Sequence, residues 1–322
     1  MKRTRICEIL GVKYPILQGG MLWLATAELA AAVSNAGALG IVSPLAGMGL
    51  DSDPGKNFEL HINKARDLTN RPFGVNIPLD LRESGILMDV VLRMDVAIVI
   101  TAAGSPANYT EVLKGRGIKV FHVVSSVKQA RAAESHNVDA VIAEGVEAAA
   151  RNGFDEIPLF SLVPQVADAV SIPVIAAGGI ADARGLVAAL ALGAEGVQLG
   201  TRFVAVTENI AHEKYKRAIL KAEDTGTVIT TRKLLPTRNL KTEFAGRLLE
   251  LEGEGASEKE IREFLGYRRS RNSQLEGDLA GGEAYGGSSA GLIHDIIPAA
   301  EVIGRLIEGY RKIIDDITAI SK

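Results

Sequence analysis

The segment AEGVEAAARNGFDEIP, residues 143–158, contains the side chains best suited to chemistry in this chain. It follows an apolar, β-branched run and carries Glu144, Glu147 and Arg151. Arginine stays protonated in proteins, so Arg151 cannot act as a general base. Its guanidinium can instead hold an anion or stabilise a developing oxyanion. We therefore predict that Arg151 orients an anionic or carbonyl-bearing substrate. The structural alternative is a clamp between Arg151 and Glu147 or Asp155.

Two further ionisable residues stand near the ends of predicted strands. Glu144 directly ends the run at 139–145, where it could contact a cofactor or substrate. His122 lies near the end of the run at 119–124 and could face the barrel interior or the helix layer. We predict both as catalytic candidates beside Arg151.

These side chains need a scaffold that brings the ends of several strands together. Eight short apolar runs recur, with helix-like stretches or long connections between them. The runs are continuous rather than alternating, which is typical of parallel strands buried on both faces. They predict an α/β fold, a (β/α)8 TIM barrel, with a doubly wound open sheet as the alternative. The runs occupy 14–20, 38–43, 73–78, 96–101, 119–124, 139–145, 172–179 and 196–203, and three of the helices occupy 25–37, 125–137 and 182–194, the last capped by Asp182.

The pattern changes after the eighth run. Residues 208–275 are charged, helix-prone and free of strand-like runs, so we predict a C-terminal helical insertion that caps the active site. The glycine-rich stretch 277–296 suits a loop that folds over a ligand, with a flexible linker as the alternative. The predicted domains are a TIM barrel at 1–207 and 276–322 and the insertion at 208–275.

Glycines end the last two strands of the predicted barrel. Gly178 and Gly179 follow the seventh strand, and Gly200 with Thr201 follows the eighth. Such glycines leave backbone N–H groups uncovered, and many barrels bind phosphate at this position. Tight turns without a ligand are the alternative. We predict a phosphate site, to which the hydroxyl of Thr201 contributes.

A flat ligand would fit the end of the first strand. Gly19 and Gly20 let the backbone approach it, and Met21 can cover its face. Asn76 is a polar amide at the end of an otherwise apolar strand, and a buried amide needs partners. A heterocycle would supply them, although an asparagine that bridges two loops would look the same. With the phosphate site, these residues predict a mononucleotide cofactor such as FMN.

Composition narrows the class of protein. The formal net charge is −3, so no polybasic surface for nucleic acid or membrane is expected. Cys7 is the only cysteine and no residues have metal-ligand spacing, so no metal site is expected. The N-terminal segment lacks the apolar core of a secretory signal, and no apolar run reaches the roughly 18 residues of a membrane span. We expect a cytoplasmic protein with a small-molecule substrate, and a homodimer is compatible with the sequence.

Five motifs carry a family resemblance: TRICEILGVKYPILQGGM, GVNIP, AVIAEG, IPVIAAGGIADARGLVAALALGAEGVQLGTRF and SSAGLI. Together they resemble the nitronate monooxygenase (2-nitropropane dioxygenase) family, which includes FMN-dependent enoyl-ACP reductase II enzymes and NADH:quinone reductases. The resemblance covers nearly the whole chain and implies a TIM barrel with non-covalent FMN. It implies flavin contacts from Gly20, Met21 and Asn76, closure over the flavin by Gly153, and phosphate contacts from Gly179, Gln198, Leu199, Gly200 and Thr201.

The chain departs from the family pattern at the rim. Where the family typically reads EAGGHxG, residues 147–153 read EAAARNG. Arg151 thus takes the place of the catalytic histidine, and Ala149 and Ala150 replace two glycines. Val123 stands where some members carry a lysine, as in the enoyl-reductase pattern, whereas FDEIP resembles the quinone-reductase branch.

These departures decide the predicted function. Arg151 cannot deprotonate a nitroalkane, but oxidising a nitronate already formed needs no such base. We predict an FMN-dependent oxidoreductase in which hydride passes from NADH or NADPH to flavin N5 and on to an enoyl thioester, enone or quinone. The alternatives are a nitronate monooxygenase that oxidises alkyl nitronates with O2, and a flavin-binding homologue whose catalysis has been altered or lost. No nicotinamide motif is readable, so the sequence leaves the choice of donor open.

Overall fold

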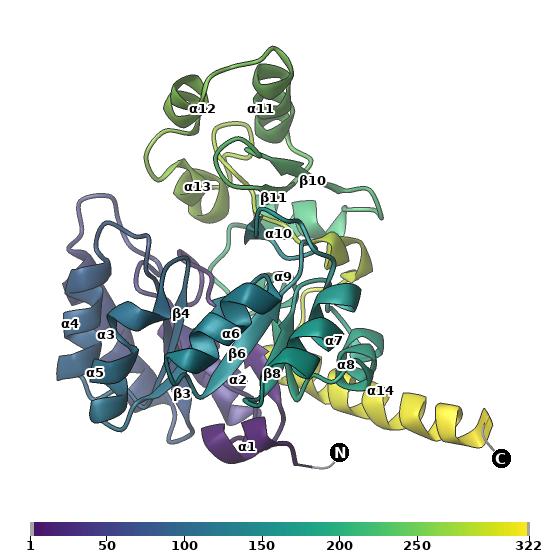
Figure 1. Ribbon diagram of the computed structural model, residues 1–322. Coiled ribbons are helices and arrows are strands. Elements are labelled where there is room, and N and C mark those ends of the chain that lie inside the picture. The colour runs from purple at the N-terminus through teal and green to yellow at the C-terminus, as the bar shows by residue number, and fades with distance from the viewer. Residues whose placement is uncertain (1–2, 321–322) are drawn as a thin grey trace.

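The computed structural model describes residues 3–320, and its main body is a barrel of eight parallel strands (Figure 1). The strands follow the order β1-β9-β8-β6-β5-β4-β3-β2 around the sheet. A parallel bridge between Leu17 and Leu39 joins β1 to the chain entering β2 and closes the barrel. The predicted TIM barrel is confirmed, and the open sheet is excluded. The strands are β1 (Ile16–Gln18), β2 (Gly40–Val42), β3 (Phe73–Pro78), β4 (Ile98–Ala102), β5 (Lys119–Val124), β6 (Ala140–Glu144), β8 (Val174–Ala177) and β9 (Gly196–Leu199).

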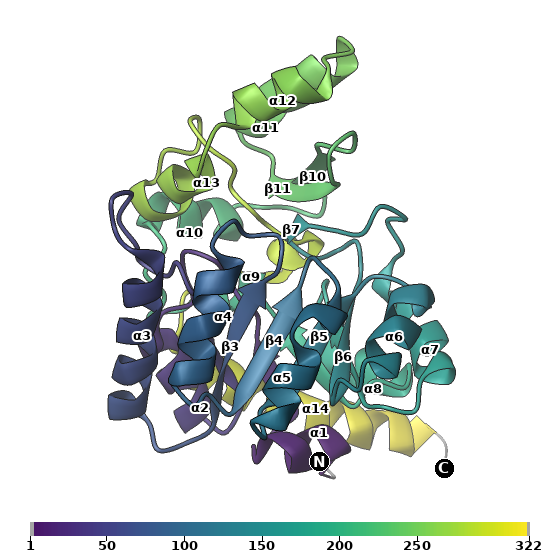
Figure 2. The ribbon, with the colours of Figure 1, turned by 60° about the vertical axis from the view of Figure 1, so that its left-hand side comes forward.

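Helices surround this barrel (Figure 2). The last helix, α14 (Ala299–Ile320), packs against both α8 and α2 and so completes the outer ring. The predicted cap of α8 is confirmed, because the Asp182 carboxylate accepts a hydrogen bond from the Arg184 N–H at 2.8 Å. The other helices of the barrel are α1 (Arg5–Leu10), α2 (Ala27–Asn35), α3 (Pro54–Leu68), α4 (Ser84–Arg93), α5 (Thr110–Gly115), α6 (Val127–Ser135), α7 (Leu159–Ala169) and α8 (Ala183–Ala191).

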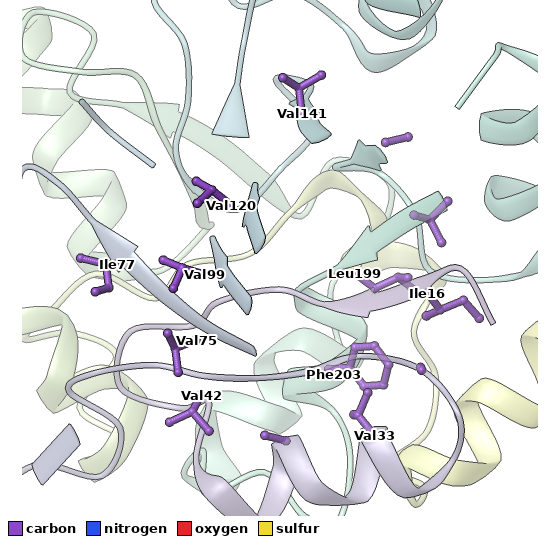
Figure 3. Close-up of a cluster of buried hydrophobic side chains, with 14 of the residues drawn as sticks. Ile16, Val33, Val42, Val75, Ile77, Val99, Val120, Val141, Leu199 and Phe203 are labelled. Atoms are coloured by element: carbon purple, nitrogen blue, oxygen red, sulfur yellow. The ribbon is translucent and has the colours of Figure 1, made fainter. Parts of the chain in front are cut away.

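The barrel strands bury apolar side chains on both of their faces. One face packs against the helices, as for Val75 and Val99 in Figure 3. The opposite face fills the barrel interior with side chains such as Ile100 and Phe121, and Ile6 of α1 joins this cluster. Successive strand residues point to opposite sides, so a continuous apolar run is needed to satisfy both layers. Full burial of each such side chain stabilises the fold by about 1.5–3 kcal/mol.

The segment 208–275 is not purely helical, and the expectation that it lacks strands is wrong. It contains the antiparallel pair β10 (Thr227–Thr230) and β11 (Thr237–Leu240), and β11 also pairs with β7 (Ala150–Arg151). Each strand has only four residues, and the partner β7 lies far away in the sequence, so no long apolar run announces them. The short helix α9 (Thr201–Val204) precedes this region, whose own helices are α10 (Glu213–Leu220), α11 (Glu243–Gly253), α12 (Glu258–Leu265) and α13 (Arg269–Arg271).

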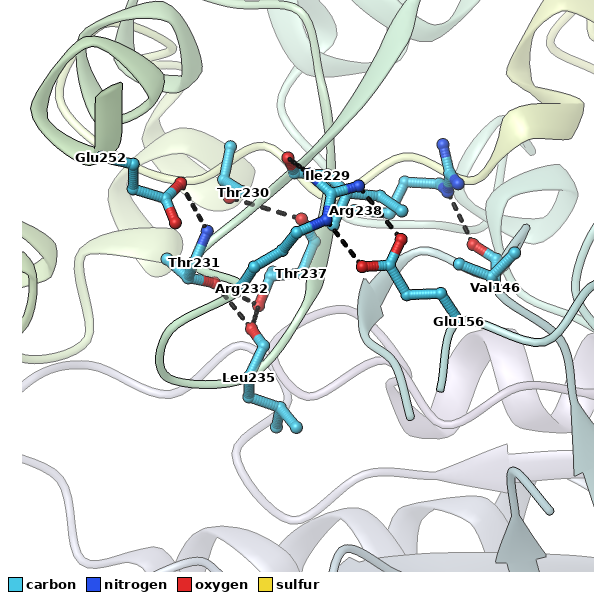
Figure 4. A network of polar contacts seen from close by, with 10 residues as sticks. All are labelled: Val146, Glu156, Ile229, Thr230, Thr231, Arg232, Leu235, Thr237, Arg238 and Glu252. Atoms are coloured by element: carbon cyan, nitrogen blue, oxygen red, sulfur yellow. Dashed lines mark hydrogen bonds and ion pairs between the residues drawn. The ribbon is translucent and has the colours of Figure 1, made fainter. Parts of the chain in front are cut away.

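Arginines from this segment bind it to the loop that follows β6 (Figure 4). The Arg238 Nε–H donates to the Val146 carbonyl at 2.7 Å. Arg232 forms an ion pair with Glu156 at 2.6 Å. Because β7 belongs to the same loop, the strand pairing and the arginines together fix the position of Arg151.

Between residues 3 and 320, no helix is both long and apolar enough to cross a membrane.

Residues 1–2 and 321–322, which belong to the predicted barrel segments, lie outside the described part of the chain. The predicted boundaries at 207 and 276 stay a proposal.

Candidate active site

A pocket with a volume of about 660 Å³ lies at the C-terminal ends of the barrel strands. Barrel enzymes hold their active sites at this end. Both the barrel and the segment after β9 contribute to its lining. Of the residues singled out in the sequence, the pocket is lined by Gly20, Met21, Asn76, His122, Glu144, Arg151, Gly153, Gly178, Gly179, Gln198, Gly200 and Thr201.

The ends of β8 and β9 form the glycine-lined end of the pocket. Gly178 and Gly179 have φ angles of +101° and +70°, which favour glycine. A side chain added at Gly200 would meet no protein atom within 4 Å, so the space beside this residue is open. The Thr201 hydroxyl accepts a hydrogen bond at 3.1 Å from the N–H of Gly287, which belongs to the glycine-rich loop. This geometry fits a phosphate group.

The floor of the pocket joins three loops. A side chain at Gly20 would overlap the amide of Asn76, so only glycine allows their close approach. The Ser43 hydroxyl donates to the Asn76 amide oxygen and accepts from the Met21 N–H, the latter at 3.0 Å. Asn76 therefore bridges loops, as the structural alternative proposed, and it also lines the pocket.

Gln198 carries an unpaired acceptor toward the pocket. Its Oε1 atom is buried and has no hydrogen-bond partner among the described residues. Leaving a buried acceptor unpaired costs about 1–3 kcal/mol, which a ligand N–H group would relieve. With the open space at Gly200, this orphaned atom makes the pocket fit a flavin mononucleotide.

Leu199 does not share the position of Gln198. Its side chain lies in the core beside Ile16 and Phe203 (Figure 3), because neighbouring residues on a strand point to opposite sides. Its carbonyl accepts from the Gly19 N–H at 2.8 Å. Leu199 is absent from the pocket lining, so its side chain is not placed to hold a phosphate there.

Burial changes the protonation of two candidates. It raises the pKa of Glu144 to about 7, so at neutral pH both forms of the carboxyl are populated. It lowers the pKa of His122 to about 4, so the imidazole is neutral at pH 7. Thr101 Oγ1 lies 2.7 Å from His122 Nδ1. His122 lines the pocket, which settles its facing, and both residues lie on barrel strands beneath the mouth.

Arg151 forms an ion pair with Asp80, and not with Glu147 or Asp155 as the structural alternative proposed. Glu147 instead accepts from the Leu159 N–H at 2.9 Å. The Arg151 side chain is 58% exposed, and both it and Asp80 line the pocket. The guanidinium therefore stands at the mouth with donors free to meet a solute.

The turn at β7 keeps a backbone conformation that glycine would adopt more easily. Ala150 has a φ of +64°, in the left-handed region that disfavours a side chain. This strain accompanies the replacement of the two family glycines by alanines. Pairing of Ala150 with Arg238 across the β7–β11 strands holds the turn.

Sequence reasoning missed several pocket residues. The glycine-rich stretch 277–296 was expected to cover a ligand, and residues of this stretch line the pocket. Its Tyr285 is one of them but was not predicted as a site residue. The missed residues come from the loop after β5, from α6 and from the segment after β9, where no motif marks them. They are Ser125, Gln129, Tyr215, Leu235, Gln274, Tyr285 and Ser289.

The described part of the chain contains no cluster of possible metal ligands. Residues 3–320 contain no group of three or more histidine, cysteine, aspartate or glutamate side chains that could hold a metal ion.

Fold and pocket define a flavin-binding TIM-barrel oxidoreductase. The chain belongs to the nitronate monooxygenase family, whose model matches residues 3–85 and 83–309. A "Probable nitronate monooxygenase" of Staphylococcus saprophyticus is 38% identical over 78% of this chain and 82% of its own length. A Mycobacterium tuberculosis "(3aS,4S,5R,7aS)-5-hydroxy-7a-methyl-1-oxo-octahydro-1H-indene-4-carboxyl-CoA dehydrogenase" is 38% identical over 76% of this chain and 68% of its own length. The structure of FabK from Thermotoga maritima superimposes with a TM-score of 0.92, with 42% identity over 99% of this chain and all of that one.

Proposed function

We propose that this protein is an FMN-dependent reductase that takes electrons from NADH or NADPH and reduces an enoyl thioester, enone or quinone. The observation that carries the proposal is the exposed guanidinium of Arg151 at the mouth of the flavin pocket. A permanent cation there cannot remove a proton from a neutral substrate, but it can hold an anion or a polarised carbonyl. The substrates named are those in which negative charge develops on oxygen during reduction.

The residues present would hold FMN in a defined way. Gly178, Gly179, Gly200 and Thr201 would surround its phosphate, and Gln198 would accept from an N–H of the ring. When bound, FMN supplies a two-electron carrier whose N5 accepts and donates hydride. The glycine-rich loop bonded to Thr201 would exclude water from the phosphate end.

A CoA thioester is the substrate class with independent support. The M. tuberculosis relative is named for a carboxyl-CoA substrate. The phosphates of such a substrate match the exposed cation at the mouth, since a guanidinium binds phosphate oxygens through paired N–H donors. The segment 208–275 would then act as the cap under which the acyl chain enters.

Nitronate oxidation with O2 is the second candidate, because the S. saprophyticus relative carries that name. A nitronate is an anion, so Arg151 could hold it as well. The neutral imidazole of His122 and the carboxyl of Glu144 lie deeper in the pocket, where either could contact it.

Anaerobic titration of the yellow protein with NADH and then NADPH, following the flavin band, tests the choice. Bleaching by one nucleotide, followed by reoxidation with crotonyl-CoA, an enone or a quinone, is the expected result. A flavin that stays oxidised, together with oxygen uptake on an alkyl nitronate, would favour the second candidate. Failure of both reactions would point to a flavin-binding homologue with altered chemistry.

The role of Arg151 is tested with Arg151→Ala. We expect KM for crotonyl-CoA to rise about tenfold, because the variant loses one charge-assisted contact worth about 1.4 kcal/mol. Arg5→Ala is a matched control, because Arg5 is similarly exposed and paired, with Glu195, but does not line the pocket. Unchanged KM and turnover in Arg151→Ala, with flavin still bound, would refute the substrate role.

A further inference from the structure

The glycine-rich loop contributes a tyrosine to the pocket lining, and no reaction step described so far uses its phenol. Tyr285 lines the pocket, and its hydroxyl donates to the Glu283 carboxylate at 3.0 Å. An antiparallel bridge between Tyr285 and Asn239 attaches this loop to the β10–β11 pair. Because β11 also pairs with β7, the same small sheet holds both Tyr285 and Arg151.

We propose that Tyr285 is the proton donor to the substrate and that Glu283, hydrogen-bonded behind it, resupplies the proton. The proposal rests on the proposed reductase function and adds the group that completes the reaction. Reduction of an enoyl thioester needs one hydride and one proton, and Arg151 occupies the rim position without an acid of suitable pKa.

For an enoyl thioester, the proposed reduction balances in atoms and electrons. Bound FMN would supply a hydride that comes from NAD(P)H; with this hydride the β-carbon would gain its new C–H bond, and the π electrons would move to the thioester oxygen. The α-carbon then takes the phenolic proton of Tyr285 as the enolate electrons return. The phenolate takes a proton from the Glu283 carboxyl, which solvent reprotonates. The net change is consumption of NAD(P)H and one proton.

The surroundings of Glu283 favour the protonated form of its carboxyl more than water does. Burial raises its pKa, against the lowering effects of Tyr285, Arg151 and Asn239. The buried Asn239 Oδ1 has no hydrogen-bond partner among the described residues. A protonated Glu283 would place a donor beside the Asn239 amide. Arg151 also favours the phenolate of Tyr285, although burial and Glu283 together raise the phenol pKa.

Two neighbouring groups are weaker candidates for the same role. Tyr215 lines the pocket too, but it is only 1% exposed and its hydroxyl donates to the Tyr285 carbonyl. Glu144 lies at the end of a barrel strand, deeper than the loop that carries Tyr285. Both serve as comparisons in the test.

The test uses the flavin-loaded enzyme in D2O with crotonyl-CoA and the active nucleotide, and it determines the deuterium on the α-carbon of the product. The wild type is expected to label one face of that carbon. Tyr285→Phe is expected to lower kcat by roughly a hundredfold, because a positioned general acid commonly contributes that much to the rate. Its product is expected to carry deuterium on both faces of the α-carbon. Tyr215→Phe, the matched loss of a phenol hydroxyl, is expected to label one face.

Glu283→Gln keeps a hydrogen-bond partner for Tyr285 but cannot pass a proton. We expect single-face labelling, an unchanged KM, and a kcat reduced about tenfold with an altered pH profile. This variant decides the matter if Tyr285→Phe does not fold or loses its flavin, because an unchanged kcat and pH profile would overturn the relay.

Other outcomes separate the two proposals. If the wild type reduces crotonyl-CoA and Tyr285→Phe keeps its rate and single-face labelling, the donor assignment is wrong and the reductase stands. Loss of single-face labelling in Glu144→Gln but not in Tyr285→Phe would move the role to Glu144. If the wild type reduces no enoyl thioester, enone or quinone, the proposed function fails and the donor assignment fails with it.

Discussion

The two sides of the pocket are built in opposite ways. The phosphate end of the cofactor side consists of the ends of adjacent strands β8 and β9, and its residues lie between 177 and 201. The substrate side combines Asp80, Arg151 and Tyr285, which come from three distant segments. The first side presents glycine backbone with the Gln198 and Thr201 side chains, whereas the second presents charged and phenolic side chains. The first therefore depends on two neighbouring strands, and the second on the packing of distant segments.

The two sides also differ in rigidity and in electrostatic strength. Parallel strands with buried side chains hold the cofactor side. The ion pair between Arg151 and Asp80 is 58% and 34% exposed, and such pairs contribute only about 0–1 kcal/mol. Changes on the substrate side should therefore alter specificity with little effect on folding.

The largest effect is expected for Gly200→Ala. Its added methyl group would meet no protein atom within 4 Å but would enter the space assigned to the phosphate. FMN titration by fluorescence should show a Kd raised at least about a hundredfold, or about 2.7 kcal/mol, with little change in the Tm of the flavin-free protein. Gly246→Ala in α11 has equal space outside the pocket and should leave FMN binding unchanged. Equal Kd values for both variants would place the phosphate elsewhere.

Glu144 should make stability depend on pH. Its folded-state pKa of about 7 exceeds the ordinary 4.5, so its contribution is complete below pH 4.5 and is lost as pH rises through 7. Urea unfolding of the flavin-free proteins measures this effect. As the pH rises from 4.5 to 8, the unfolding free energy of Glu144→Gln should increase relative to that of the wild type by up to about 3 kcal/mol. His122 titrates in both proteins, so its effect cancels in this difference. A gap between the two proteins that does not change with pH would contradict the raised pKa.

Gln198→Leu should affect folding and cofactor binding with opposite signs. Removal of the unpaired Oε1 should raise the unfolding free energy of the flavin-free protein by about 1 kcal/mol. Loss of an acceptor for the flavin should weaken FMN binding about tenfold. Calorimetry of the two forms measures both effects. A variant that is less stable without flavin would show that Gln198 has a structural partner instead.

The smallest effect is expected for Asp80→Asn. The change frees the guanidinium of Arg151 for substrate, so KM for crotonyl-CoA should fall about two- to threefold, with stability altered by less than about 1 kcal/mol. Steady-state kinetics at low ionic strength measure it, because salt screens exposed charges. Glu195→Gln, which disrupts the Arg5 pair outside the pocket, is the matched control. A rise in KM would mean that Asp80 positions Arg151 and does not compete for it.

Prediction from sequence succeeded where the signal was local. The apolar runs gave the barrel strands, and Asp182 marked the start of α8. It failed for β10 and β11, because their sequences TVIT and TRNL contain no continuous apolar run. It also assigned Leu199 to the phosphate on resemblance, although strand alternation turns that side chain into the core.

By itself the sequence determined the barrel and the glycine-lined end of its pocket, because both follow from the order of residues within single strands and turns. Only the tertiary structure decided that Arg151 meets Asp80, that His122 faces the pocket, and that Tyr285 and Glu283 lie in the same site. Those pairings join loops distant along the chain. Their geometry depends on how the segment after β9 packs over the barrel, which no local pattern encodes.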